Sequence, residues 1–275
     1  MEEKHMRTQA KKLAAAGLTA AMTVTMLAAC GTKATPENLL SDMSKRSEDV
    51  ESMMANVKMD LNVSVSGDNM RMSMDFDMES INEPEMSSAK GEVSIGSGDM
   101  DITMKMETYS EKKEEEYVIY TMMNDMWTME TADSSEMAAD MELVSGDIEK
   151  FSDKFELKEG LVEVNGKDCF ELAGELDGEV LAQVMDEDML SSFTGLGADE
   201  SDLKDLILPC TINIYRDSIL PARIYFDMGD SLLPLAEGLG MEKAECTMEM
   251  TFLEYNKVKE IIIPEEALEA KGTYE

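Results

Sequence analysis

Apolar and polar residues alternate over most of the chain from about residue 59 onward. Successive side chains of a β-strand point to opposite faces, so each alternating run gathers its apolar residues on one face. This pattern is typical of antiparallel strands that have one apolar and one solvated face. It predicts strands at residues 59–65, 70–78, 93–95, 100–106, 117–123, 126–129, 155–164, 167–172, 209–216, 220–228, 246–252 and 258–263.

Short turn sequences separate these runs. Asn165-Gly166 is the strongest of them, because Asn and Gly accept the positive φ angles of a two-residue hairpin. Gly67-Asp68-Asn69, Gly96-Ser97-Gly98 and Asn124-Asp125 are further turn signals. We therefore expect successive strands to form a meander of hairpins.

Three segments have helical instead of strand spacing. Thr35-Pro36-Glu37 is a favourable helix start, with Thr as the N-cap, Pro at the first helical position and an acid in the first turn. The predicted helices cover residues 36–54, 135–144 and 177–190. No Pro- or Ser-rich linker and no repeat of fixed period divides the chain. The sequence therefore predicts one α+β domain over residues 36–275, with about 11–12 antiparallel strands and a few helices.

The N-terminal residues predict export from the cytoplasm. A basic region precedes an uncharged stretch at residues 13–26. About 20 apolar residues are needed to span a bilayer, so this stretch is too short for a stable transmembrane helix and suits a signal peptide. The basic region consists of Lys4, Arg7, Lys11 and Lys12.

The junction Leu27-Ala28-Ala29-Cys30-Gly31 resembles a bacterial lipobox. The resemblance implies that residues 1–29 are cleaved and that Cys30 carries a diacylglyceryl group with palmitate-type chains. Residues 30–35 would then be a short lipidated tether, which reaches about 17 Å when extended. The alternative is an ordinary secretory signal that happens to contain a cysteine. With the lipobox, we expect anchoring on the extracytoplasmic face of the cell membrane.

Composition excludes several functions. With 24 Lys and Arg against 59 Asp and Glu, the formal net charge is −35, which argues against a nucleic-acid partner. The single histidine, His5, lies in the predicted leader, so the mature chain has no His for a catalytic triad or a His-ligated metal. No phosphate-binding loop, nucleophile elbow or calcium loop is present. We therefore expect a protein that is not an enzyme and that holds no cofactor and no metal.

Methionine is unusually frequent, with 28 residues, and many lie two apart on predicted strands. Three interpretations are open: Met as core filling, Met as a flexible lining for an apolar ligand, and thioether ligands for Cu(I), which lack a second ligand type here. The candidate ligand-facing residues are Met70, Met72, Met74, Met100, Met104, Met106, Met248 and Met250.

The cysteines beyond Cys30 point to packing. Cys210 and Cys246 are in phase with the apolar face of their predicted strands, whereas Cys169 is out of phase with Phe170. If one strand lies between Cys210 and Cys246, they are about 10 Å apart, too far for a disulfide. We expect no essential disulfide.

The order of these elements resembles the LolA/LppX-type lipoprotein fold, in particular small Gram-positive lipoproteins of uncharacterised type. The resemblance also rests on the late segments 211–224 (Thr-Ile-Asn-Ile-Tyr-Arg-Asp to Leu-Pro-Ala-Arg-Ile) and 252–264 (Phe-Leu-Glu-Tyr-Asn to Ile-Ile-Ile-Pro). It implies a large, curved, half-barrel antiparallel sheet that wraps helices and holds a lipid or another apolar molecule. Two functions stay open: a membrane-anchored lipoprotein that binds an apolar ligand on a concave sheet lined by Met, and a cell-envelope interaction module with a filled core, an acidic surface and an unknown protein partner.

Overall fold

The computed structural model describes residues 34–65, 67–98, 100–114, 116–133, 148–178, 206–229 and 241–270. The predicted leader, the tether residue Cys30, the helix predicted at 135–144 and nearly all of the helix predicted at 177–190 lie outside these ranges.

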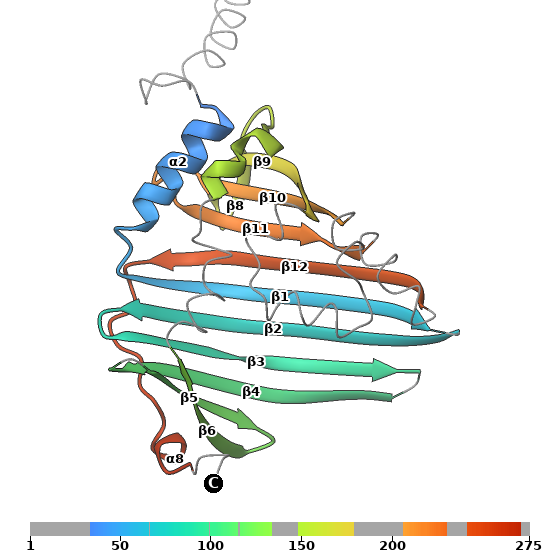
Figure 1. The fold of residues 1–275 in the computed structure, drawn as a ribbon, viewed down its shortest axis with the longest axis vertical. Coiled ribbons are helices and arrows are strands. Elements are labelled where there is room, and N and C mark those ends of the chain that lie inside the picture. Colours follow the sequence, from blue (N-terminus) through green and yellow to red (C-terminus); the bar gives the residue numbers. More distant parts are fainter. Residues whose placement is uncertain are drawn as a thin grey trace, which may run out of the picture.

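One antiparallel sheet of 12 strands dominates the molecule (Figure 1). The strand order is β6-β5-β4-β3-β2-β1-β12-β11-β10-β9-β7, with β8 paired to β9. The two ends of this order, β6 and β7, do not pair with each other within the described ranges, so the sheet is open, as a half-barrel requires. The strands are β1 (Ser52–Val65), β2 (Asp68–Asn82), β3 (Glu85–Ser97), β4 (Met100–Lys113), β5 (Glu116–Met123), β6 (Met126–Asp133), β7 (Phe155–Leu157), β8 (Val162–Val164), β9 (Lys167–Asp177), β10 (Ile207–Tyr215), β11 (Pro221–Asp227) and β12 (Met241–Tyr255).

Helical structure among the described residues consists of α2 (Pro36–Ser47), the 3₁₀ segment η1 (Ile148–Lys154) and the short α8 (Glu265–Leu268). The Thr35 side chain accepts a hydrogen bond from the backbone N–H of Asn38, which confirms the predicted N-cap. The predicted end of this helix at residue 54 is wrong. Met53 and Met54 belong to β1, where they pair with β12, because strand pairing outweighs their helical spacing.

Most of the predicted hairpins are present. β8 and β9 meet across Asn165-Gly166, and β5 and β6 meet across Asn124-Asp125, where both residues have positive φ. Two predicted strands are wrong. Residues 155–164 form two short strands, β7 and β8, and not one, because the chain turns away from β9 between them. Residues 258–263 are not a strand; β1 and β11 already pair with the two edges of β12, the strand that precedes them.

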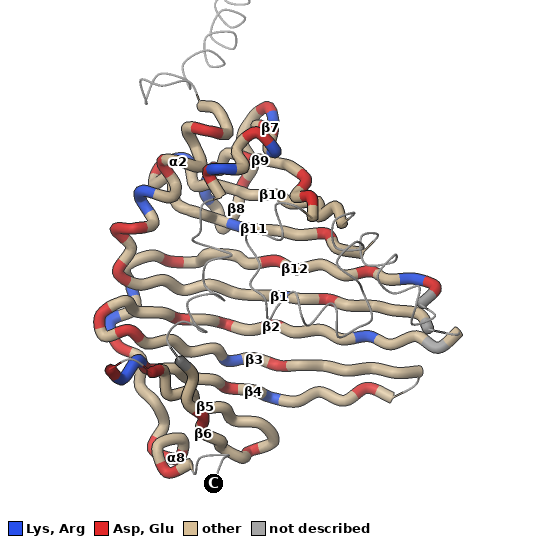
Figure 2. Tube along the Cα trace, viewed as in Figure 1, with Lys and Arg blue, Asp and Glu red and all other residues tan. Residues whose placement is uncertain are grey.

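The register divides the sheet into two faces, because directly opposite residues of an antiparallel pair lie on the same face. The face that contains the eight candidate methionines is called the methionine face, and the opposite one the charged face. Figure 2 shows acidic and basic positions distributed along the strands. On the charged face of β1 to β4 these include Lys58, Asp60, Arg71, Asp75, Glu92, Asp101 and Lys105.

The largest buried cluster lies at the β7–β12 end of the methionine face. α2 contributes three buried residues to it. The same cluster contains Leu172, Ile212, Ile214 and Phe252 from the sheet, each at most 2% exposed. A second cluster joins Ile261 and Ala267 of the C-terminal segment to Ile81, Tyr109 and Tyr120. This contact accounts for the course of residues 257–270 along one end of the sheet (Figure 1).

Candidate apolar binding face and polar groove

Strand pairing brings all eight predicted methionines onto one face. Met74 of β2 is opposite Met59 of β1, and Met59 is opposite Met248 of β12. On the other side of β2, Val93 of β3 is opposite both Met74 and Met104. The remaining candidates follow from the same registers: Met70, Met72, Met100, Met106 and Met250. The sequence therefore predicted their shared face; their contact with a ligand stays a prediction.

The methionines of this face differ in burial. Met72, Met74, Met104, Met106, Met248 and Met250 are half-buried. At the ends of β2 to β4 near Gly67 and Gly98 the side chains are more open: Met100 is 71% exposed, Ile102 59%, Met70 47% and Ile95 40%. We call Met70, Ile95, Met100 and Ile102 the open rim.

The sequence interpretation missed two further members of this apolar region. Met123 is opposite Met106 and Met126 is opposite Met123, so both continue the methionine face onto β5 and β6. They are 44% and 69% exposed. Their position on either side of the Asn124-Asp125 turn was the signal that could have placed them there.

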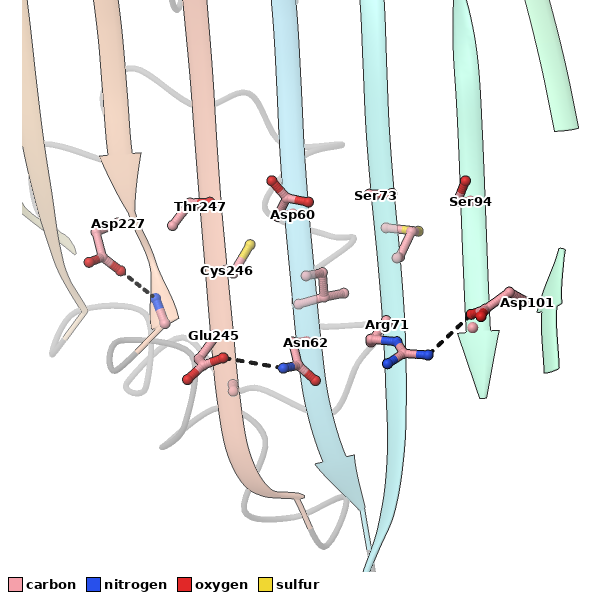
Figure 3. Close-up of a pocket in the computed structure, with 15 residues that line it drawn as sticks. Asp60, Asn62, Arg71, Ser73, Ser94, Asp101, Asp227, Glu245, Cys246 and Thr247 are labelled. Atoms are coloured by element: carbon pink, nitrogen blue, oxygen red, sulfur yellow. Dashed lines mark hydrogen bonds and ion pairs between the residues drawn. The ribbon is translucent and has the colours of Figure 1, made fainter. Parts of the chain in front are cut away.

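A hollow of about 610 Å³ lies on the sheet near the same strand ends (Figure 3). Its charged and polar side chains belong to the charged face and form two rows across the strands. One row runs Asp101, Gly96, Arg71, Asn62, Glu245, and the next runs Ser94, Ser73, Asp60, Thr247, Asp227. We call this hollow the polar groove. Of the eight candidate methionines only Met72 lines it, so the hollow is not the methionine-lined concavity that the sequence predicted.

Hydrogen bonds and ion pairs cross the polar groove. Arg71 pairs with Asp101 at 3.2 Å over the main chain of Gly96, where a Cβ would collide with the Asp101 carboxylate. Asn62 donates to Glu245 at 3.2 Å. The hydrogen bond from Lys243 lowers the pKa of Glu245. Among the described residues no His, Cys, Asp and Glu side chains form a group of three or more that could hold a metal ion.

The three described cysteines are free and buried. β11 lies between β10 with Cys210 and β12 with Cys246, which confirms the strand arrangement predicted for this pair. Cys169 packs with Tyr215 and Ala222 on the charged face, as its phase predicted. Burial raises the pKa of all three thiols, in the case of Cys210 to about 12. They are therefore protonated at neutral pH and are poor nucleophiles.

Comparison with known proteins gives one family and several structures. The model of the Family of unknown function (DUF6612) matches residues 35–272. No curated protein matches the chain. LprF from Mycobacterium bovis is similar at 13% identity and a TM-score of 0.45, covering 84% of this chain and 97% of LprF. The Mycobacterium tuberculosis lipoprotein LppX is similar at 14% identity and a TM-score of 0.47, covering 82% of this chain and 98% of LppX.

These TM-scores are below 0.5 and do not establish a common fold. The LolA/LppX-type relation therefore remains a resemblance. No helix in the described part of the chain is long and apolar enough to cross a membrane.

Proposed function

The chain belongs to the DUF6612 family, and we propose that it is a lipid-anchored, extracytoplasmic binding protein whose methionine face holds an apolar molecule. Cys30 is the proposed anchor and the open rim is the proposed entry to the binding face. In this proposal the protein binds and does not catalyse.

The observation that carries the proposal is the open rim. Large contiguous apolar patches are uncommon on soluble monomers and usually mark a binding surface. Here Met100 and Ile102, both more than half exposed, lie beside Met70 and Ile95 on one continuous face. Contact of these side chains with water is unfavourable. An apolar ligand that covers them would gain about 25 cal/mol of binding free energy for each Å² of apolar surface removed from water.

Residue type and length support a flexible lipid chain as the occupant. Methionine is unbranched and polarizable, so a methionine surface adapts to ligands of irregular shape. From Met100 to Met106 the strand extends about 20 Å at 3.4 Å per residue. One leaflet of a bilayer's hydrocarbon core is about 15 Å thick, so an acyl chain of membrane length fits along this strand.

The proposed anchor keeps the α2 end of the domain close to the membrane. Ala34 packs against the buried cluster around α2, and Cys30 precedes it by four residues, which span at most about 14 Å. Two acyl chains hold a protein on a membrane far more firmly than one. The Cys30→Ser variant is therefore expected to lose lipidation and to leave the detergent phase in a partitioning assay. Unchanged partitioning would refute the anchor.

Native mass spectrometry of the chain from residue 31 onward, purified without detergent, tests the ligand. We expect a co-purified apolar molecule that is lost on denaturation. A protein that is always empty, and that also fails to take up a fluorescent lipid probe, would contradict binding on the methionine face. Trp127 is the single Trp, so energy transfer from it reports a probe bound near β4 to β6.

The polar groove favours a second candidate, an interaction module for a basic partner. Four carboxylates and a single arginine line the groove, in a chain of net charge −35. Binding of this kind weakens as salt rises, since charges on a surface are screened. A basic partner that is captured at low salt and is no longer captured by the Asp60→Asn, Asp227→Asn double variant would support this candidate. Capture that is unchanged by salt and by the double substitution would exclude the polar groove as the binding site.

A further inference from the structure

The methionine face carries no charge along residues 57–63 of β1, 70–76 of β2, 91–97 of β3 and 100–106 of β4, the stretches that contain or adjoin the open rim. In these stretches every second residue points to this face, and all of these residues are apolar, Gly or Ser. They are Val57, Met59, Leu61 and Val63 of β1; Met70, Met72, Met74 and Phe76 of β2; Gly91, Val93, Ile95 and Ser97 of β3; and Met100, Ile102, Met104 and Met106 of β4. The next position of β2 with the same register, Asp68, is an acid and not a cation.

The cations of these strands lie elsewhere. Lys58, Arg71 and Lys105 are on the charged face, where Lys58 pairs with Asp75 and Arg71 with Asp101. Lys90 lies 5.3 Å from the ring centre of Tyr109, also on that face. Within the described part of β1 to β4, Lys112 is the cation with the register of the methionine face. It lies near the other end of β4 and pairs with Glu85 at 2.8 Å.

The segments between the described ranges bring almost no positive charge. By sequence, residues 134–147 and 230–240 contain no Lys or Arg, and residues 179–205 contain Lys204 alone among many acids. A ligand with a carboxylate or phosphate headgroup would therefore meet an apolar face without a counter-charge. It would also be repelled by the negative electrostatic potential of a chain whose net charge is −35.

We propose that the methionine face selects uncharged lipids over anionic lipids of the same chain length. This inference rests on the proposed function and adds the ligand class to it. An alcohol, ester or glyceride headgroup can leave water at modest cost. An ionised headgroup that leaves water without a partner charge is strongly unfavourable, so the anion must keep its head hydrated and give up part of the apolar contact.

Dodecanol and dodecanoate at neutral pH are a matched pair for the test, because they share the chain and differ in charge. Their binding to the chain from residue 31 onward is measured by displacement of an uncharged fluorescent lipid probe that accepts energy from Trp127. We expect dodecanol to bind about tenfold more tightly, and the difference to shrink as salt rises.

A new cation on the methionine face sharpens the test. Ser97 lies between Met70 and Met100 on this face, so Ser97→Lys is expected to raise the affinity for dodecanoate relative to dodecanol several-fold. Ser94→Lys is the control, because Ser94 is on the same strand but on the charged face, where its hydroxyl lies 2.8 Å from that of Thr103. It should leave the preference for dodecanol in place.

Equal or tighter binding of dodecanoate by the parent chain would overturn the selectivity while leaving a lipid-binding function intact. Equal shifts of the preference in Ser97→Lys and Ser94→Lys would overturn the selectivity as well. If neither compound displaces the probe and the probe itself does not bind, the proposed function fails and the selectivity fails with it.

Discussion

The two halves of the methionine face follow one alternating pattern but differ in what they touch. In the half formed by β9, β10 and β12, Leu172, Ile212 and Phe252 are at most 2% exposed and belong to the same buried cluster as three residues of α2. In the half formed by β2 to β4, Met100 and Ile102 are more than half exposed. The alternation makes a face apolar, but only the packing of another element on it makes that face a core.

The residue types of the two halves differ in the same sense. The buried cluster of the closed half consists mainly of Leu, Ile and Phe side chains, which pack closely in one fixed arrangement. The open half is richer in methionine, with three of the eight candidate methionines on β2 and three on β4, and methionine has three rotatable bonds and tolerates varied neighbours. We infer that the closed half supplies stability and the open half supplies binding.

The largest expected effect separates the two halves by stability. Phe252→Ala removes a fully buried ring from the closed half and should lower the free energy of unfolding by about 3–5 kcal/mol. Met100→Ala in the open half should change it by less than about 0.5 kcal/mol. Denaturant titration measures both. Similar losses for the two variants would mean that the open half is also core.

A second variant tests how closely the strands of the open half are packed. Gly91 of β3 lies on the methionine face between Phe76 and Met106, and a Cβ there would collide with the backbone carbonyl of Asp75. Gly91→Ala should therefore cost about 1–3 kcal/mol of unfolding free energy, since the strands must shift apart. Ser97→Ala, on the same strand and face, is the control and should be close to neutral. A neutral Gly91→Ala would show that β2 and β3 separate easily.

The open rim itself can be made polar without disturbing the closed half. Met100→Ser combined with Ile102→Ser should weaken probe binding about tenfold, which corresponds to about 1.4 kcal/mol, while the unfolding midpoint stays nearly constant. Thr103→Ser, beside them on the charged face, is the matched control. If lipid uptake survives the double change, the ligand lies on another part of the chain.

The smallest expected effect concerns the polar groove. Arg71 and Asp101 are 58% and 68% exposed, so water and salt screen their ion pair. Asp101→Asn should change the unfolding free energy by at most about 1 kcal/mol, and less at high salt. Denaturant titrations at two salt concentrations measure this. A loss comparable with that of Phe252→Ala would make the charged face a structural element, contrary to the contrast between the halves.

Local chemistry was enough to predict much of this architecture. The Thr35 cap, the Asn165-Gly166 hairpin and the alternation around Met74 each depend on neighbouring residues, so the sequence determined them. The shared face of the eight methionines follows from the two-residue period of strands together with tight hairpins.

Tertiary structure alone decided the order of the strands and which half of the methionine face is buried. β1 pairs with β12 at the centre of the sheet, although nearly 200 residues separate Met59 from Met248, and this pairing converts the predicted helix end at Met53 into strand. It also leaves residues 258–263 to pack against Tyr109 and Tyr120 instead of extending the sheet. Alternation specifies which side chains share a face, but it does not specify which distant strand or helix reaches that face. That choice depends on the free energy of long-range packing, which is why the sequence determined the apolar face and only the tertiary structure divided it into a core and an open rim.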